Sequence, residues 1–345
     1  MGRRFPSPCF PLHRRAGQTG MTLVELMVSM ALGLIVVAAA ISIFLASREA
    51  NRDTESLSRI QENARIAFDL MHRSMREVGG IPCGAGASSI TYAVPPGAEW
   101  YATAGASYEA LALEGKTDDG IGGASAQIQR PDGGNYTVEY ASGSGDSVRL
   151  LTFSSDTGGG GLSPIIAQSG NTLTLQSIDG FDPNGIFLAC DQSKGSIFTG
   201  GRFSASPTAS MPERGTFIAT HFDPVAFGLT TIGAYLAMLH PEVWFIGKNE
   251  RGGRSLYRVA DSGADEIAPD AVNMRIEYLV PGAAAYADAG KIAADDWPKV
   301  VAIRIVLTLR SDSTRSATAP GVIERTLAHT VTLRSRQPVQ ALPPP

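Results

Sequence analysis

A glycine, a methionine and a carboxylate lie close together before a long apolar run near the N-terminus. Residues 20–25 read GMTLVE, and no charged residue follows Glu25 until Arg48. A carboxylate costs roughly 2.5 to 3.5 kcal/mol at the centre of a membrane helix and needs a neutralising partner. Cleavage between Gly20 and Met21 would supply one, because the new α-amino group is positively charged at neutral pH. That amine would lie four residues before Glu25 on one helix face, or meet the glutamate of a neighbouring chain in a bundle. Such a cut would therefore give Glu25 a neutralising partner and, between chains, a register for assembly.

Other residue types that carry chemistry lack the spacing that catalysis requires. Gly115-Lys116-Thr117 ends like a phosphate-binding loop, but Ala110 stands where that loop needs its first glycine. The G-x-S-x-G motif of a serine nucleophile does not occur. We therefore expect no catalytic residue, no cofactor and no enzymatic activity.

Candidate metal ligands are scattered in the same way. The histidines lack the paired spacing of a zinc helix and form no Cys–His cluster. Beyond His13 in the first 20 residues they are His72, His221, His240 and His329. Asp118-Asp119 and Asp295-Asp296 offer the oxygen ligands that calcium prefers, but acidic pairs are also common in turns. We expect no metal site, with calcium at one of the acidic pairs as the open alternative.

The element that must position Gly20 and Glu25 is a membrane-length helix. Residues 26–46 contain no charge, and 21 helical residues at about 1.5 Å each span roughly the 30 Å core of a bilayer. Four basic residues precede the run, Arg3, Arg4, Arg14 and Arg15. Because no acidic residue precedes Glu25, we expect a cytoplasmic N-terminus and export of the rest of the chain.

Two simpler interpretations of this stretch compete with processing at Gly20. An ordinary secretory signal has an apolar core of about 7 to 15 residues and a small-residue cleavage site. Ala38-Ala39-Ala40 resembles such a site, but the apolar run is too long and continues to Ala46. A plain signal anchor explains the length and the arginines, yet it leaves Gly20 and Glu25 without a role.

Beyond the apolar run the sequence stays helical in pattern. Apolar residues recur at spacings of three and four over residues 57–78, which indicates one buried stripe. The stripe consists of Leu57, Ile60, Ala64, Phe68, Met71, Met75 and Val78. No proline occurs between residues 21 and 78, and Gly79-Gly80 followed by Pro82 is a helix stop. We predict one helix over 21–80 that spans the membrane, or lies in a fibre core, over 21–46 and is amphipathic thereafter.

The remaining sequence predicts a β-rich domain over residues 81–336. Residues 242–246 and 255–259 flank the turn-rich GKNERGG, which is the pattern of a hairpin with a long connection. Further strand candidates alternate or cluster β-formers, at 136–140, 147–153, 172–175, 186–190, 196–199, 270–280, 300–310 and 325–334. The tail over 337–345 contains four prolines and is expected to be disordered.

The composition and the number of cysteines limit which partners and which redox state can be expected. The net charge of −4 indicates no polyanionic partner such as nucleic acid. Cys9 would leave with residues 1–20, so Cys83 and Cys190 would remain as an even pair in an oxidising compartment. We predict a Cys83–Cys190 disulfide, with two unpaired buried thiols as the alternative.

The N-terminal features resemble a known export signal. Residues 20–25, with arginines before them and an apolar run after, look like the class III signal of type IV pilins and type II secretion pseudopilins. In that family a dedicated peptidase cuts after the glycine and methylates the new N-terminus, and the glutamate guides docking. The resemblance makes residues 1–20 a leader peptide, Met21 the methylated residue and Glu25 the docking glutamate. Met21 departs from the family, in which phenylalanine is commoner at this position.

The chain is also similar to the PilW family of minor type IV pilins. The likeness covers both ends and the middle, in the segments MALGLIV, QENARIAFDLMHRSMREVGGIPCG, FLACDQSKGSIF, VWFIGKNERGGRSLYR, DAVNMRIEYLV and RTLAHTVTLRSR. Residues 85–180 match no motif of the family. The resemblance implies an α+β, pilin-like fold, in which one long N-terminal helix packs on a β-rich globular domain.

The same resemblance implies a function and a location. A minor pilin is a single-pass inner-membrane protein with a periplasmic domain until it enters an extracellular pilus, where it acts at the start of assembly or at the tip. Its implied partners are other minor pilins, the major pilin, the prepilin peptidase and methyltransferase, and a large tip adhesin. The implied processes are adhesion, twitching motility or DNA uptake. The alternatives are a minor pseudopilin of type II secretion and a membrane-anchored periplasmic binding module.

Overall fold

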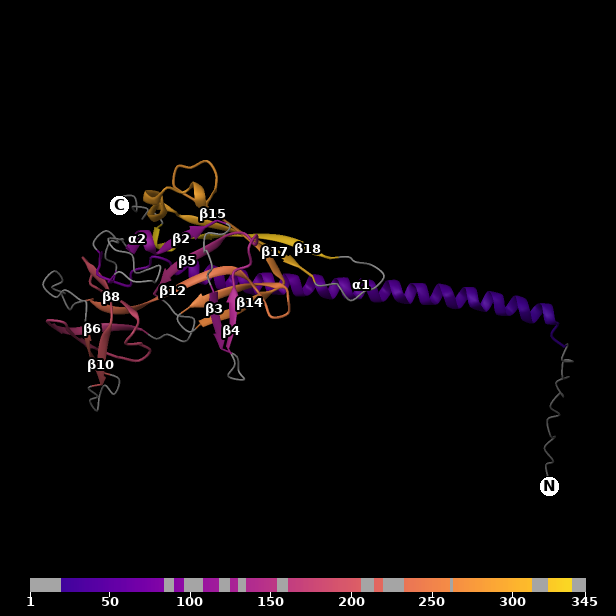
Figure 1. The fold of residues 1–345 in the computed structure, drawn as a ribbon, viewed down its shortest axis with the longest axis horizontal. Coiled ribbons are helices and arrows are strands. Elements are labelled where there is room, and N and C mark those ends of the chain that lie inside the picture. The colour runs from indigo at the N-terminus through magenta and orange to yellow at the C-terminus, as the bar shows by residue number, and fades with distance from the viewer. Residues whose placement is uncertain are drawn as a thin grey trace, which may run out of the picture. The chain divides into compact units, whose positions relative to one another are not determined.

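The computed structural model describes most of the chain after the first nineteen residues (Figure 1). The described residues are 20–83, 90–95, 108–117, 125–129, 135–153, 161–205, 214–219, 233–260, 263–311 and 322–336. The expectations for the leader before Gly20, for Asp118-Asp119, for His221 and for the tail over 337–345 lie outside these residues.

One helix, α1 (Leu23–Glu77), begins the described chain, in agreement with the long helix predicted over 21–80. The chain divides into two compact units between Glu55 and Ser56, and α1 runs through the division. In the first unit every side chain of the helix is exposed, and α1 is long and apolar enough to cross a membrane. The apolar surface of this unit is therefore left for lipid or for other helices to cover.

In the second unit α1 is amphipathic, as the spacing predicts. Its buried residues lie at intervals of three and four and are Ile60, Ala64, Ala67, Met71, Ser74 and Met75. Val78 is also buried just beyond the helix. Gly79 then adopts a φ of 66°, the left-handed conformation that ends many helices and that glycine adopts without strain.

Among the residues that the structure describes, the strands form three sheets. The largest contains β1 (Ile90–Tyr92), β2 (Leu113–Lys116), β5 (Ser147–Thr152), β6 (Leu162–Ser169), β7 (Thr172–Leu175), β8 (Ile186–Cys190), β9 (Gly195–Thr199), β10 (Gly201–Ala205), β11 (Gly215–Ala219), β12 (Tyr235–Lys248), β13 (Arg254–Ala260) and β14 (Gly263–Pro269). The second has the order β16 (Ala287–Asp288), β15 (Ala271–Leu279), β17 (Ala302–Arg310) and β18 (Glu324–Thr332). The third is the hairpin of β3 (Ser125–Gln129) and β4 (Asn135–Glu139). Short helical turns complete the elements, namely α2 (Tyr108–Leu111) and the 3₁₀ turns Ala289–Lys291, Ala294–Lys299 and Arg334–Arg336.

Strand β12 organises the largest sheet. Its first half pairs with β8 and β6, and its second half pairs with β5 and β13, so it joins segments far apart in the sequence. Most of its side chains are buried, which explains why it reads as a nearly continuous apolar run. The β12–β13 hairpin confirms the hairpin predicted from residues 242–246 and 255–259.

Two large hydrophobic cores and a small cluster around Phe245 and Tyr257 lie in the second unit. The larger joins the buried stripe of α1 to both large sheets. The smaller lies among β6, β7, β8, β9, β10 and β11 and contains a cluster of aromatic rings. Phe203 stacks on Phe217 with ring centroids 4.5 Å apart, and Phe217 also packs on Phe187 at 4.8 Å. The fold is therefore α+β, with one long N-terminal helix followed by a strand-rich domain, as the sequence predicts.

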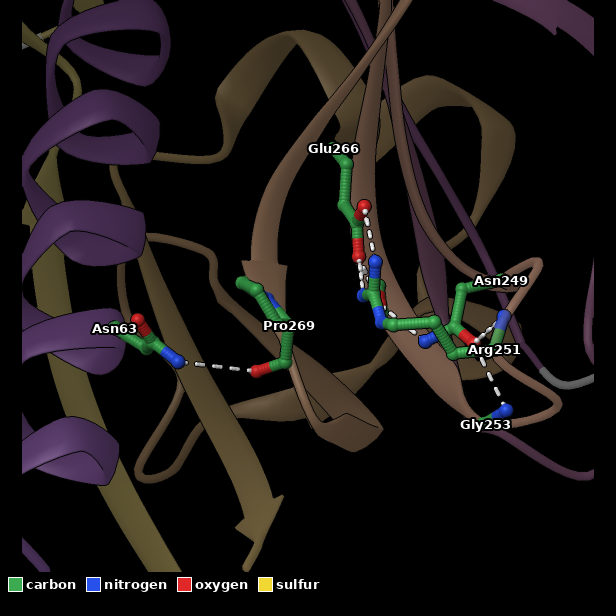
Figure 2. A network of polar contacts seen from close by, with 7 residues as sticks. Asn63, Asn249, Arg251, Gly253, Glu266 and Pro269 are labelled. Atoms are coloured by element: carbon green, nitrogen blue, oxygen red, sulfur yellow. Dashed lines mark hydrogen bonds and ion pairs between the residues drawn. The ribbon is translucent and has the colours of Figure 1, made fainter. Parts of the chain in front are cut away.

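Polar contacts fix the hairpin and the helix in register (Figure 2). The Asn249 side chain accepts hydrogen bonds from the backbone N–H groups of Arg251 and Gly253, at 3.1 and 2.8 Å, and so closes the turn. Arg251 reaches from this turn to both carboxylate oxygens of Glu266 on β14. Asn63 of α1 donates to the carbonyl oxygen of Pro269 at 3.3 Å, which ties the helix to the end of β14.

A pair of histidines joins α1 to β18. His72 Nδ1 and His329 Nε2 are 3.2 Å apart, so one ring donates a hydrogen bond that the other accepts. Phe68 stacks on His329, with ring centroids 5.4 Å apart. Burial lowers the pKa of His72 below its ordinary value of 6.5, and positive charge at His329 lowers this pKa further. Arg76 acts in the same direction, and Asp69 opposes it.

This histidine pair predicts that the fold loses stability in mild acid. The folded-state pKa of His72 lies below 6.5. The contribution of this side chain to the free energy of unfolding is therefore complete above pH 6.5, where the ring is neutral in both states. That contribution is lost as the pH falls from 6.5 through the folded-state pKa, where the unfolded chain binds the extra proton more readily. We expect the thermal midpoint of the full chain in detergent to fall from pH 7.5 to 5.0, and to fall less in His72→Gln. A His72→Gln chain with the parent's pH dependence would contradict this assignment.

Candidate functional site

The segment that precedes α1 is open to an enzyme. Gly20 and Met21 lie outside regular secondary structure, and both are exposed, Met21 by 61% of its surface. Among the described residues, apart from its chain neighbours, no heavy atom lies within 4 Å of the position that a Cβ on Gly20 would take. The bond between Gly20 and Met21 is therefore accessible without any unfolding of the helix.

Thr22 caps the helix that follows. Its Oγ1 accepts a hydrogen bond from the backbone N–H of Glu25 at 3.2 Å, and its carbonyl oxygen accepts one from Leu26 at 3.1 Å. Thr22 and Glu25 have the spacing of a capping box, in which an N-cap hydroxyl satisfies a backbone donor of the first turn. Thr22 is not among the residues predicted above to be functional, although the Thr-x-x-Glu pattern before an apolar run is the signal for such a cap. Thr22 places the helix start two residues after Met21.

Glu25 lies exposed in the first turn of α1. The N-terminus of a helix favours negative charge, because the backbone N–H groups of the first turn point outward along the axis. In the described part of the chain, the carboxylate of Glu25 makes no ion pair.

The surface around Glu25 and beyond it is apolar on all sides. The large exposed apolar side chains of α1 in this unit include Leu23, Val24, Met27, Met30, Leu34, Ile35, Val36, Ile41, Ile43 and Phe44. Exposed apolar patches larger than a few hundred Å² mark sites of membrane or protein contact. This part of α1 therefore requires a lipid bilayer or a bundle of similar helices.

A disulfide fixes the chain just after α1. Cys83 and Cys190 are bonded, with Cα atoms 5.9 Å apart and a sequence separation of 107 residues. Cys190 is the last residue of β8 and is fully buried, and Cys83 is 7% exposed. The bond ties the segment after the helix to the largest sheet. The structure thus contains the predicted disulfide and not the alternative of two free thiols.

The other candidate residues do not converge on one site. Gly115 and Lys116 lie in β2, so they form part of a strand rather than a phosphate-binding loop. Asp295 and Asp296 begin a 3₁₀ turn, in which Asp296 pairs with Lys299 at 2.8 Å.

Metal ligands were also expected to be absent. Among the described residues, no group of three or more His, Cys, Asp or Glu side chains could hold a metal ion. The absence of a metal in the whole chain remains a prediction.

Comparison with known proteins assigns the N-terminal segment. The family model of the prokaryotic N-terminal methylation motif matches residues 15–41. These residues include the proposed cleavage bond, the capping threonine and Glu25. Searches of curated proteins and of solved structures found no match to the chain. The segment therefore carries a prepilin-like signal, which indicates a type IV pilin or pseudopilin type of protein.

Proposed function

We propose that the chain is a minor pilin of a type IV pilus, of the PilW type. Prepilin peptidase cuts it after Gly20 and methylates Met21. The protein then waits as a single-pass inner-membrane subunit, with residues before α1 in the cytoplasm and the β-rich domain in the periplasm. It enters the pilus with other minor pilins and the major pilin, at the start of assembly or at a tip that carries an adhesin. There it supports adhesion, twitching motility or DNA uptake, without enzymatic activity of its own.

One observation carries this proposal. An exposed Gly20–Met21 bond precedes a capped helix whose first half is apolar and exposed on every side, within a matched methylation motif. A membrane anchor alone needs the apolar surface but neither the accessible bond nor a carboxylate four residues later. Assembly into a helical bundle uses all three features, because the helices that leave the lipid cover one another and Glu25 meets an amine.

The processing step is tested by expressing the full chain with and without a prepilin peptidase. We expect the peptidase to yield a mature chain that begins at Met21 and carries one methyl group, as read by intact mass and N-terminal peptides. Gly20→Val should abolish this product because a branched side chain replaces the hydrogen at the cleaved position. Gly33→Ala, within the apolar run, is the matched control and should be cut normally. An intact Met1 start, or a cut near Ala40, would overturn the proposal in favour of an anchor or a secretory signal.

A separate experiment tests whether the chain belongs to a type IV pilus or to a type II secretion system. A minor pseudopilin of type II secretion would have the same architecture. Deletion of the chain should reduce surface pili and leave type II secretion unchanged, whereas the opposite result would assign it to secretion.

A further inference from the structure

The outer edge of β18 presents unpaired backbone groups. Leu333 N–H donates to Val301 O, and Ser311 N–H donates to Ile323 O, at the two ends of the β17–β18 ladder. The register between these ends has no bulge. Hydrogen-bonded and non-hydrogen-bonded pairs alternate in an antiparallel ladder, so the odd-numbered residues of β18 bond to β17. The N–H and C=O groups of Thr326, Ala328 and Thr330 therefore point away from β17.

The outer side of this edge has no strand partner among the described residues, and the middle of β18 has few of the features that protect an edge. β18 is the last strand of its sheet, and no described strand pairs with its outer side. Natural edge strands are usually short, bulged, or guarded by proline or charged residues. β18 is nine residues long and regular, and it has no proline or formally charged side chain between Thr326 and Thr332. Such an edge is a template for the addition of another strand.

A groove lies beside the open edge. It has a volume of about 580 Å³ and lies between residues 61–72 of α1 and the middle of β18. Ala64 and Phe68 on the helix, with Leu327 and Ala328 on the strand, give it an apolar lining. A strand added to β18 would place alternate side chains in this groove, because side chains alternate between the two faces of a strand.

Charge around the groove favours a partner that carries a carboxylate. A second hollow of about 270 Å³ adjoins the groove at Asp69 and His72. The formally charged residues that line the two spaces are Arg65, Arg73, Arg76, Arg334, Asp69 and Glu77. Arginines outnumber carboxylates there, although the chain as a whole carries a net charge of −4. A second copy would bring the same excess of arginine against this one, which like-charge repulsion disfavours.

We propose that β18 accepts a β-strand from a different subunit of the pilus, with a carboxylate of that strand beside Arg65. The inference rests on the proposed function, because it names a contact within the assembled fibre. The incoming backbone bonds to Thr326, Ala328 and Thr330, its apolar side chains enter the groove, and its carboxylate meets the arginines. The strand thereby joins the exported domain to a neighbour, independently of the contacts made by the apolar half of α1.

The first test is Ala328→Pro in the full chain, produced in piliated cells. Proline removes the outward N–H and blocks the edge, yet it is tolerated in edge strands where the N–H faces solvent. We expect normal cleavage after Gly20 and an unchanged thermal midpoint. The amount of the variant chain in sheared pili should be at least about tenfold lower, because several backbone hydrogen bonds to the added strand are lost together. Ala328→Thr keeps the N–H and matches the neighbouring threonines, so it should enter pili like the parent. Equal incorporation of Ala328→Pro and Ala328→Thr would overturn the strand proposal.

The second test concerns the charge and the identity of the partner. Arg65→Glu should lower incorporation, while Arg202→Glu, at an exposed arginine of β10, should not. Equal incorporation of these two variants would overturn the carboxylate assignment. Ala328→Cys chains that form disulfide-linked homodimers in oxidised pili would show that a second copy occupies the edge, and would also overturn the proposal.

Hydrogen exchange separates the strand contact from the function on which it depends. We expect peptides that cover Glu324–Thr332 to exchange rapidly in the membrane fraction and slowly in assembled pili. Rapid exchange in assembled pili would reject the strand contact and leave the pilin assignment intact. A chain that is never cleaved after Gly20 and never reaches pili would reject the pilin assignment, whatever the behaviour of β18.

Discussion

A Glu25→Gln chain is expected to be cut after Gly20 like the parent but to enter pili at least about a hundredfold less. The carboxylate lies at the edge of an exposed apolar surface, which under the proposed function other helices enclose on assembly. Within the described chain Glu25 makes no ion pair, and under the proposed function an amine of the mature N-terminus balances its charge. Removing one member of a buried ion pair costs about 3 to 5 kcal/mol because the other charge remains uncompensated. Since about 1.4 kcal/mol is tenfold in an equilibrium constant, the loss exceeds a hundredfold.

Glutamine tests charge rather than shape. It keeps the size of glutamate and a side-chain oxygen, and the Thr22 cap depends on the backbone N–H of residue 25, which remains. The helix start should therefore persist, and the helix content of the variant in detergent should match that of the parent. The measurement is the ratio of the chain in sheared pili to the chain in membranes, on quantitative immunoblots.

Glu49→Gln is the matched control for this variant. Glu49 is an exposed glutamate of the same helix, beyond the apolar run, and it should tolerate the change. If Glu25→Gln and Glu49→Gln chains enter pili equally, docking through Glu25 is excluded even where cleavage after Gly20 is normal.

The sequence predicts the elements of this fold better than their arrangement. The long helix, its buried stripe and the β12–β13 hairpin follow from local periodicity, because the residues concerned are neighbours in the chain. The pairing of β12 with β5 and β8 does not follow, because it joins segments separated by tens of residues. β6, β10 and β11 were likewise not predicted as strands. β6 contains a proline, and β10 and β11 are only five residues long, so none has a clear strand pattern, and pairing with neighbouring strands determines their conformation.

The burial of one charged residue, Glu277, could not be predicted from the alternation of residues within its strand. The alternation along β15 places Glu277 opposite the apolar face, but its side chain is only 6% exposed. Burial alone raises the pKa of Glu277, yet hydrogen bonds from Arg275 and Arg304 outweigh it and lower that pKa. Arg304 comes from β17, the neighbouring strand, so sequence spacing within β15 contains no information about this contact.

The candidate site divides in the same way. Gly20, Met21 and Glu25 are recognisable from sequence because their spacing along one segment is itself the signal. Thr22 was recognisable too, since capping depends on residues three apart. The open edge of β18 was not, because a strand is an edge only when the order of the whole sheet is known. Its outward groups further depend on which pairs of the ladder are hydrogen-bonded.

Removal of the disulfide is expected to cause the largest loss of stability in the strand-rich domain. The bond joins residues 107 apart in sequence, and closing a loop of about 100 residues restricts the unfolded chain by roughly 4.7 kcal/mol in the chain-entropy account. For domains of this size, 1 kcal/mol shifts the thermal midpoint by about 2 to 4 °C. The double variant Cys83→Ala, Cys190→Ala should therefore unfold roughly 10 °C or more below the parent. Thermal unfolding of the mature chain, followed by circular dichroism in detergent, measures the difference.

Single variants separate the crosslink from the packing of the two side chains. If the bond acts mainly as a crosslink, Cys83→Ala and Cys190→Ala should each cost nearly as much as the double variant, because either change opens the same loop. If packing dominates, Cys190→Ala should cost more than Cys83→Ala, since Cys190 is fully buried among the residues of β8. Cys9→Ala is the control and should leave the mature chain unchanged. A double variant that unfolds within about 2 °C of the parent would contradict the stabilising role, because even 1 kcal/mol produces a shift of that size.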